Sequence, residues 1–300
     1  MNSQDQIRFN QLYERHLTEL TLQGKSKKTI EMYSRSICKL AAYFDTCPDT
    51  ITTEQLKQYF LALVKSHSWS SVKIDRNAFQ FFYQYVLNKE WVWVNIVKPP
   101  RVQPLQDVLA ISELAAIINA TRKLSYQVYF LTTYSLGLRL SEALQLRVAD
   151  IDGTLMRVHL RQCKNNKQRF VPLPLITLKA LRRYWLTHRH PELIFPGGKP
   201  PHFRQGKSLY MDKGGGQKAI KLVAKECGIS KNVHIHTLRH SIATHLLEAG
   251  VSLRSIQVFL GHASPVTTAQ YTRMTEQAQQ NSALMLNALV DQLSIKWVKS

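Results

Sequence analysis

Apolar residues recur at intervals of three and four between residues 6 and 98, which is the spacing of amphipathic helices. The first predicted helix carries Leu12, His16 and Leu20 on one face. Ser26 and Thr53 each precede a further apolar stripe and are expected to cap the second and third helices. These stripes consist of Ile30, Tyr33, Ile37, Leu40 and Phe44, then of Leu56, Tyr59, Phe60 and Leu63. With a fourth helix over residues 70–87, the pattern predicts an all-helical domain.

Prolines interrupt this periodicity between residues 98 and 104. Because proline lacks the backbone donor that a helix or a central strand requires, this segment is predicted to link two domains. The chain therefore divides into a domain over residues 1–98, a linker over 99–106 and a domain over 107–300.

The second domain mixes helical and strand patterns. Helices are predicted over residues 111–120, 126–135, 139–146, 175–187 and 217–227. Strand-forming residues on either side of residues 162–169 predict a hairpin, and residues 192–195 predict a short strand. The glycine-rich segment 196–216 lacks the spacing of a phosphate-binding loop, so we expect a mobile surface loop.

Residues 236–250 predict a helix whose two faces differ in polarity. Its apolar band consists of Leu238, Ile242, Ala243, Leu246 and Leu247, and its polar face of Thr237, Ser241, Thr244, His245 and Glu248. His236 and Arg239 fall inside the apolar band. A guanidinium there is costly unless it meets an anion, which can be an internal carboxylate or a bound ligand.

Further helix signals follow this stretch. Gly250 is expected to end the helix, and Ser252 is expected to cap a second one that reaches Gly261. Ser264 and Pro265 then predict the start of a short helical segment. Three helix ends are thereby expected to converge on one point, to which they bring His236, Arg239, His262 and Tyr271.

The length of the chain indicates the number of domains, and its charge indicates the class of partner. A chain of 300 residues suggests two domains, and 40 Lys and Arg against 20 Asp and Glu give a net charge of +20. Such an excess of positive charge indicates a polyanionic partner, of which nucleic acid is the first candidate. A membrane surface is the alternative, but the sequence has no apolar run of ~18 residues and no basic helix with an aromatic face.

The cysteines and the amino terminus indicate the compartment. Four scattered cysteines, without the close pairs of a zinc or redox motif, are expected to be reduced thiols: Cys38, Cys47, Cys163 and Cys227. Residues 1–8 contain no apolar leader, so a cytoplasmic protein is expected.

Five motifs together resemble the active-site signature of the tyrosine recombinases, the phage integrase family that includes the Xer-type resolvases. Residues 236–239 read His-Thr-Leu-Arg, residues 260–262 read Leu-Gly-His, and Tyr271 follows. Upstream, Tyr-Ser-Leu-Gly-Leu-Arg-Leu-Ser-Glu-Ala-Leu at 134–144 resembles the family's first arginine box. Lys-Asn-Asn-Lys-Gln-Arg-Phe-Val-Pro at 164–172 resembles its hairpin lysine motif.

This resemblance is strongest over residues 107–272 and has consequences for fold and function. It implies a mainly α fold, in which a helical SAM-like core-binding domain precedes a mixed, predominantly helical catalytic domain with a small antiparallel sheet. It implies a site-specific recombinase or integrase that cuts and rejoins double-stranded DNA through a 3′-phosphotyrosine intermediate, without a metal or other cofactor. It also implies a homotetramer on paired sites.

Roles for the reacting groups follow from the resemblance and from phosphoryl-transfer chemistry. Tyr271 is the expected nucleophile, whose oxygen displaces one DNA strand. Arg139 and Arg239 are expected to hold the non-bridging phosphate oxygens, because guanidinium groups match their geometry and stay charged. Glu142 is expected to orient Arg139; a surface ion pair three residues apart is the simpler alternative.

The departing 5′ oxygen needs a proton, which an ammonium on a hairpin loop can deliver. Lys164 is expected to supply it, and Lys167 is the alternative. His236 and His262 are expected to donate hydrogen bonds to the phosphate or to assist proton movement at the tyrosine. Either histidine alone would more often be structural.

Basic residues at the helix ends of the first domain are expected to follow the DNA backbone. These residues are Lys25, Lys27, Lys28, Lys73 and Arg76. Taken singly, each would be a solvated surface charge.

Two metal sites are rejected on the sequence. His236 and His240 have the spacing of a zinc helix, but Thr237 occupies the place of the required glutamate. Asp150 and Asp152 lack a matching third acid for a two-metal site.

Small departures from the family pattern suggest an uncommon branch, such as one carried by a mobile element. They are Ile242, Cys163 with Asn165 and Asn166, and Arg273.

Two other functions remain open on the sequence alone. A type IB topoisomerase would use the same chemistry without pairing two sites. A non-catalytic DNA-binding regulator would not need the full set of six expected catalytic residues, which are Arg139, Lys164, His236, Arg239, His262 and Tyr271. Beyond Tyr271, an apolar stripe at helical spacing is expected to dock on a neighbouring subunit or on its own catalytic domain. The stripe consists of Leu286, Leu289, Val290 and Leu293.

Overall fold

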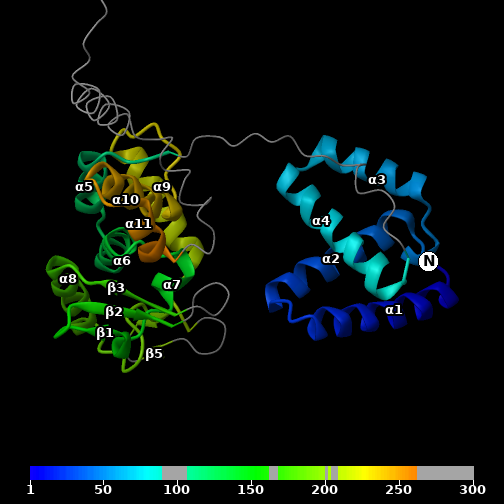
Figure 1. Cartoon of the computed structure of the whole chain (residues 1–300), viewed down its shortest axis with the longest axis horizontal. Coiled ribbons are helices and arrows are strands. Elements are labelled where there is room, and N and C mark those ends of the chain that lie inside the picture. The colour runs from blue at the N-terminus through cyan, green and yellow to red at the C-terminus, as the bar shows by residue number, and fades with distance from the viewer. Residues whose placement is uncertain (90–106, 162–167, 200–201, 204–208, 262–300) are drawn as a thin grey trace, which may run out of the picture. The chain divides into compact units, whose positions relative to one another are not determined.

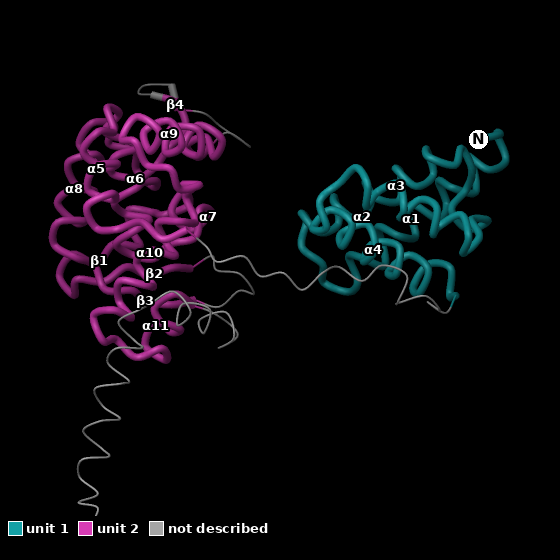
Figure 2. Tube along the Cα trace, turned by 90° about the horizontal axis from the view of Figure 1, so that it is seen from above, with its two compact units in different colours: residues 1–103 teal, residues 104–300 magenta. Residues whose placement is uncertain are grey.

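The computed structural model describes residues 1–89, 107–161, 168–199, 202–203 and 209–261. The chain divides into two compact units, residues 1–103 and residues 104–300 (Figure 2). The predicted linker at 99–106 lies outside the described residues. Within the described ranges, no helix is both long enough and apolar enough to cross a membrane.

The described part of the first unit is helical (Figure 1). Its α-helices are α1 (Ser3–Leu22), α2 (Lys27–Phe44), α3 (Thr53–Ser66) and α4 (Trp69–Phe81), with the 3-10 turn η1 (Pro48–Thr50) and the π-helical turn η2 (Phe82–Val86). The apolar stripes of α2, α3 and α4 meet in one core, where Ile37, Phe60 and Phe79 are fully buried. The periodic apolar positions therefore do form one helical core.

The helix starts of this unit confirm one predicted cap and correct another. The Ser26 side chain accepts a hydrogen bond from the Thr29 backbone amide at 3.2 Å, as expected for the start of α2. The predicted cap at Thr53 is wrong, because Thr52 is the capping residue of α3. Its hydroxyl accepts from the Gln55 amide, and the Gln55 side chain accepts from the Thr52 amide in return.

The described part of the second unit consists of helices with two small sheets (Figure 1). Its helices are α5 (Ile111–Ala120), α6 (Leu124–Ser135), α7 (Leu140–Leu144), α8 (Leu175–Leu186), α9 (Lys213–Glu226), α10 (Ile235–Glu248) and α11 (Leu253–Leu260), with the 3-10 turn η3 (Val148–Asp150). Its strands are β1 (Ile151–Asp152), β2 (Arg157–Leu160), β3 (Arg169–Pro172), β4 (Gly198–Lys199) and β5 (His202–Phe203). The fold is thus mainly helical with a small antiparallel sheet.

Strands β1, β2 and β3 form an antiparallel sheet in that order. Val158 pairs with Val171, and both are fully buried against the helices. On the opposite face the Arg157 guanidinium lies 4.5 Å from the centre of the Phe170 ring. The predicted hairpin is present, and Leu160 pairs with Arg169 at the base of its loop.

Two strand and loop predictions in the second unit were wrong. Residues 192–195 form no strand and make only an isolated bridge between Leu193 and Arg147. The expected loop 196–216 contains the β4–β5 pair, and its last three glycines lie in the first turn of α9. A Cβ atom on Gly215 would lie 2.5 Å from the Tyr126 hydroxyl, so close packing against α6 explains glycine inside a helix there.

Helix α10 packs against α6, α9 and α11 (Figure 1). Its predicted polar face is therefore largely buried, and Thr237, Ser241 and Thr244 are at most 1% exposed. The Ser241 hydroxyl donates to the Thr237 carbonyl and accepts from the Leu109 amide, at 2.8 and 2.9 Å. These hydrogen bonds compensate the burial of hydroxyl groups that would otherwise be costly.

The ends of α10 and α11 follow the sequence signals. Gly250 and Gly261 both adopt the left-handed conformation after their helices, with φ of 84° and 65°. The Ser252 side chain caps α11 by accepting from the Ser255 amide at 3.1 Å. Helix α7 is shorter than the predicted 139–146, because Arg139 is its extended capping residue.

Candidate active site

Glu142 lies at the centre of the candidate site. Its side chain is 2% exposed, and it projects from the first turn of α7. One carboxylate oxygen, Oε1, accepts from Nη1 of Arg139 at 2.6 Å. The other, Oε2, accepts from the Arg139 backbone amide at 2.9 Å. Glu142 therefore holds both the main chain and the side chain of Arg139, in a buried pair rather than a surface one.

Two further arginines reach the same carboxylate. Nη1 of Arg169 donates to Oε1 of Glu142 at 3.2 Å, and Nη2 donates to Oε2 at 2.9 Å. Nη1 of Arg239 lies 3.9 Å from Oε2. One buried negative charge thus faces three guanidinium groups from α7, β3 and α10.

The arginines determine the protonation state of this carboxylate. Burial by itself would raise the pKa of Glu142, but hydrogen bonding and charge from Arg169, followed by those of Arg139, lower that pKa to about 2. The carboxylate is consequently ionised throughout the physiological pH range.

The same three arginines donate to consecutive carbonyl groups at the end of α11. Nε of Arg169 donates to the Phe259 carbonyl at 3.0 Å. Nη2 of Arg239 donates to the Leu260 carbonyl at 2.7 Å, and Nη2 of Arg139 donates to the Gly261 carbonyl at 2.9 Å. These carbonyls have no partner within the helix, and the end of a helix carries partial negative charge, so cations are favoured there. Gly261, which immediately precedes His262, is thereby anchored to the arginine cluster.

Two glycines allow this close approach. Gly137 has a φ of 58°, and its carbonyl accepts a hydrogen bond from Nη1 of Arg239. A Cβ atom at Gly137 would lie 2.7 Å from the Phe259 ring, and one at Gly261 would lie 2.9 Å from the Arg169 side chain. Any larger residue at either position would displace α11 or the arginines.

Arg239 resolves the question raised by a charge in the apolar band of its helix. It is 3% exposed, and its partners include the two carbonyls of Gly137 and Leu260 together with the more distant Glu142. Arg239 therefore does have an internal carboxylate partner, Glu142, although its shorter contacts are with carbonyl groups.

His236 lies at the start of α10, with its side chain exposed. Desolvation by the surrounding protein, with the positive charges of His234, Arg239 and Arg139, lowers the pKa of His236. A neutral imidazole can donate one hydrogen bond and accept another, as a group that assists proton movement must. His240 is more deeply enclosed, and burial lowers its pKa to about 4.

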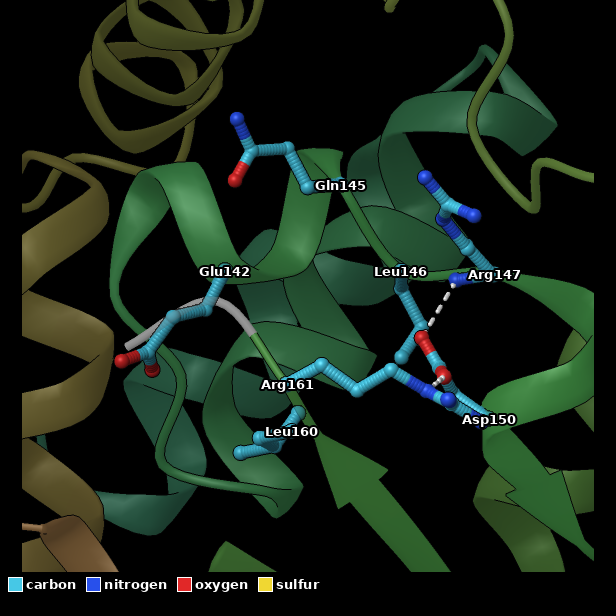
Figure 3. A pocket seen from close by; sticks show the side chains of 7 residues that line it. All are labelled: Glu142, Gln145, Leu146, Arg147, Asp150, Leu160 and Arg161. Atoms are coloured by element: carbon cyan, nitrogen blue, oxygen red, sulfur yellow. Dashed lines mark hydrogen bonds and ion pairs between the residues drawn. The ribbon is translucent and has the colours of Figure 1, made fainter. Parts of the chain in front are cut away.

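Asp150 and Asp152, the acids of one rejected metal site, accept hydrogen bonds from nitrogen donors of the protein. Within the described residues, no three histidine, cysteine or acidic side chains are grouped as metal ligands would be. Oδ1 of Asp150 instead pairs with Nε of Arg161 at 2.6 Å, and Oδ2 accepts from the Arg147 amide at 3.1 Å. Figure 3 shows this pair in a small pocket beside Glu142. Asp152 accepts from backbone amides of its own turn.

Several predicted residues lie outside the described ranges. These are Lys164, Lys167 and Cys163 in the hairpin loop, His262, Tyr271 and Arg273 after α11, and the apolar stripe at residues 286–293. The structure does place the two strands on either side of the loop and the helix end before His262.

Arg169 is a member of the site that the sequence does not predict. It lies in the motif that resembles the family's lysine motif, and that resemblance implies no role for it. Its side chain is 9% exposed, and it contacts both Glu142 and the end of α11. An arginine at the first position of a strand gives no sign of such contacts, because its partners come from residues far away in the sequence.

The predicted DNA-binding residues of the first unit lie mainly on α2 and α4. Lys27, Lys28 and Lys73 are exposed. Nζ of Lys25 lies 5.8 Å from the centre of the Phe81 ring, and Nε of Arg76 is buried without a hydrogen-bond partner among the described residues. Lys25 is exposed as well, so four of the five are accessible to a ligand.

Comparison with known proteins identifies the family. The model of the phage integrase family matches residues 107–278, which is more than half of the chain. The chain belongs to this family. The model of the phage integrase N-terminal SAM-like domain matches residues 12–93.

Individual proteins similar to this chain support the same family assignment. The chain is 33% identical over 273 residues to the "Putative integrase/recombinase y4qK" of Sinorhizobium fredii, covering 90% of this chain and 86% of that protein. It is 30% identical over 280 residues to the tyrosine recombinase XerA of Pyrococcus horikoshii, covering 92% and 93%. A crystal structure of a lambda integrase tetramer bound to a Holliday junction shares the fold, with a TM-score of 0.70 at 16% identity over 97% of this chain and 79% of that one. This family member is a tyrosine-type site-specific recombinase that acts on DNA.

Proposed function

We propose that this recombinase cuts and rejoins DNA through a covalent bond between Tyr271 and a 3′ phosphate, with arginines in place of a metal ion. The observation that carries the proposal is the arginine cluster. Arg139 and Arg239 are held by one carboxylate and by the last carbonyls of α11, and the chain continues from there into His262. Two prepositioned guanidinium groups stabilise the charge that develops on a phosphate in the transition state.

The remaining roles complete the reaction. The Tyr271 oxygen attacks the phosphorus, the 5′ oxygen leaves, and Lys164 gives that oxygen a proton. His236 and His262 hydrogen-bond the phosphate and take part in proton movement at the tyrosine. Rejoining reverses these steps with a different 5′ hydroxyl, so the energy of the broken bond is retained in the phosphotyrosine.

The first unit is proposed to close over the DNA as one half of a clamp. Its exposed lysines on α2 and α4 support this, as does the match of residues 12–93 to the family's N-terminal domain. We further propose that four subunits act on two paired sites, and that the apolar stripe at 286–293 docks on the neighbouring subunit. The crystal structure of a lambda integrase tetramer bound to a Holliday junction supports the number of subunits.

The decisive experiment is capture of the covalent intermediate. The protein is incubated with DNA fragments that flank its own coding region, in EDTA, and trapped ends are mapped on a denaturing gel. Wild type should form an adduct, and Tyr271→Phe should bind DNA equally well without forming one, because only one oxygen is removed. Tyr43→Phe, which alters an exposed tyrosine of the first unit, is the matched control and should react normally.

The alternatives give different results. An adduct that persists in Tyr271→Phe would assign the nucleophile to another residue, and a requirement for added magnesium or zinc would restore a metal mechanism. Relaxation of supercoiled DNA without exchange between two sites would indicate a topoisomerase-like enzyme. Binding without any adduct in wild type would indicate a regulator.

A further inference from the structure

Arg169 connects three parts of the site that the sequence separates widely. It begins β3, its guanidinium reaches the Glu142 carboxylate of α7, and its Nε reaches the last turn of α11. We propose, on the basis of the function proposed above, that Arg169 is a positioning residue for strand transfer. It fixes Glu142, and through Glu142 it fixes the Arg139 guanidinium that receives the scissile phosphate.

The geometry of the contact supports this role. Nη1 and Nη2 of Arg169 donate to the two different oxygens of Glu142, at 3.2 and 2.9 Å, so the two planar groups meet as a fork. Glu142 uses those same two oxygens to hold the side chain and the backbone amide of Arg139. A rotation of the carboxylate would therefore move Arg139, and the fork from Arg169 opposes that rotation.

Charge supports the same role. Glu142 is buried, and the hydrogen bond and charge of Arg169 are the foremost influences that keep the pKa of this carboxylate low. Without Arg169, the carboxylate would depend more heavily on Arg139 for its partners. The guanidinium meant for the phosphate would then be drawn further towards Glu142, and its positive charge would be less available to a second anion.

Arg169 touches protein rather than the phosphate in this arrangement. Its Nε, Nη1 and Nη2 each donate to a protein acceptor, and the side chain is 9% exposed. Arg139 is more accessible, with a side chain that is 22% exposed. The two arginines that bind this carboxylate thus have different roles. Arg139 faces the substrate, and Arg169 holds the Glu142 carboxylate that positions Arg139.

A competing role has to be separated from this one. Arg169 also pairs with Leu160 at the base of the loop that carries Lys164, and Arg161, the residue after Leu160, forms an ion pair with Asp150 (Figure 3). Loss of Arg169 could therefore act by misplacing Lys164 rather than Arg139. Arg161→Met is the matched control, because it removes an ion pair with Asp150 beside the same loop, whereas the ion pair of Arg169 is with Glu142.

The test compares wild type, Arg169→Met, Arg169→Lys and Arg161→Met on a duplex built around the mapped cleavage position. DNA affinity is measured by titration, and adduct formation is measured in a single turnover. Arg169→Met should bind DNA as wild type does and should form the adduct about 100-fold more slowly, as expected when a preorganised electrostatic site loses its order. Arg169→Lys should be intermediate, because an ammonium keeps the charge but cannot form the fork.

Two modified substrates distinguish an effect of Arg169 through Arg139 from an effect through the loop that carries Lys164. A methylphosphonate at the scissile position removes one negative charge, so the weakened Arg139 matters less, and the defect of Arg169→Met should shrink by about 10-fold. A 5′-bridging phosphorothiolate has a sulfur that leaves without a proton donor, and the defect should persist on it. If that substrate instead restores Arg169→Met, as it should restore Lys164→Ala, the residue acts through the loop and our proposal is wrong.

The remaining outcomes are equally decisive. A wild-type rate in Arg169→Met overturns the proposal. So does a defect that is unchanged on both modified substrates and is accompanied by a lower melting temperature and weaker DNA binding, which indicates a structural role. If Arg169→Met does not fold, Arg169→Lys is compared on the same two substrates and the same criteria apply. Absence of an adduct in wild type would instead refute the underlying function, so the two failures are distinguishable.

Discussion

His16 in the first unit and Glu142 in the second are both buried ionisable side chains, but their surroundings are opposite. His16 is fully buried against the edges of the Phe81 and Phe82 rings, and neither ring nitrogen has a hydrogen-bond partner among the described residues. Glu142 is surrounded by three guanidinium groups. Burial lowers the pKa of His16 to about 4, whereas the arginines lower that of Glu142 to about 2.

The comparison shows two ways of meeting the cost of burial. The histidine of the first unit loses its charge, because nothing nearby stabilises the charged form. The glutamate of the second unit keeps its charge, because its partners compensate the loss of water. A neutral buried group can be replaced by an apolar one, but a charge on which other groups depend cannot.

The largest effect is expected from Glu142→Ala. Removal of one partner from a buried ion-paired cluster typically costs about 3–5 kcal/mol, because the opposite charges remain buried. Urea unfolding at pH 7 would measure that loss, and DNA cleavage should be lost with it. A loss of stability below about 1 kcal/mol would show that the cluster does not depend on the carboxylate.

The pH dependence of wild type gives a second measure of Glu142. The pKa of this group in the folded protein, about 2, lies below its ordinary value of 4.5, so its contribution to stability is fully present above pH 4.5. It is lost as the pH falls from 4.5 towards 2, and it amounts to something on the order of 3 kcal/mol. Glu142→Ala should lose this part of the acid sensitivity.

A pair of glycine substitutions compares how closely side chains pack around one glycine in each unit. Gly24 in the first unit and Gly137 in the second have nearly the same φ, at 63° and 58°. Among the described residues, no atom beyond the adjoining residues lies within 4 Å of a Cβ on Gly24, so Gly24→Ala should cost only the backbone strain of about 1 kcal/mol. Gly137→Ala adds a clash with Phe259 and should cost about 3 kcal/mol. Equal losses in thermal or urea unfolding would show that α11 can move aside freely.

Replacement of His16 should have a moderate effect that depends on pH. The pKa of this histidine in the folded protein lies below its ordinary value of 6.5, so the unfolded chain takes up the proton first. Stability conferred by the neutral ring is therefore lost as the pH falls from 6.5 towards 4, by about 2 kcal/mol at pH 5. His16→Leu should be neutral or stabilising at pH 7.5 and should lose less stability at pH 5.

His240 provides the internal reference for that experiment. Its pKa is also lowered to about 4, and it is present in both proteins, so the difference between them isolates His16. An identical acid-induced loss in wild type and His16→Leu would show that His16 is not buried in its neutral form.

The smallest effect is expected at the surface of the first unit. Nη2 of Arg35 lies 2.9 Å from Oε1 of Glu31, and both side chains are more than 60% exposed. Exposed pairs contribute little, so Glu31→Ala should change the free energy of unfolding by less than about 0.5 kcal/mol, and less still in high salt. A loss comparable to that of Glu142→Ala would contradict the distinction between exposed and buried pairs.

Local signals predicted the elements of this protein well. The apolar stripes indicated the helices of the first unit, and Ser26, Ser252, Gly250 and Gly261 marked helix ends correctly. Each depends on neighbouring residues within about one helical turn, which is why sequence spacing suffices. Thr53 failed because Thr52 is equally able to cap and alone has Gln55 at the right spacing.

Contacts between distant segments were beyond the reach of such signals. The glycines at 214–216 suggested a loop, yet they lie in the first turn of α9, where Tyr126 of α6 packs so closely that it leaves no room for a Cβ on Gly215. The spacing of residues marked a polar face on α10, but only the neighbouring helices decide that the hydroxyl groups of this face are buried.

By itself, then, the sequence determined the two-part organisation, most helices and their ends, the hairpin, and the motifs that mark the family. Only the tertiary structure decided that Glu142 is buried, that Arg169 joins Arg139 and Arg239 around it, and that all three donate to the end of α11. The physical reason is range. Helix periodicity and capping act within a few residues, whereas the partners of a buried charge come from whichever segments the fold packs around it.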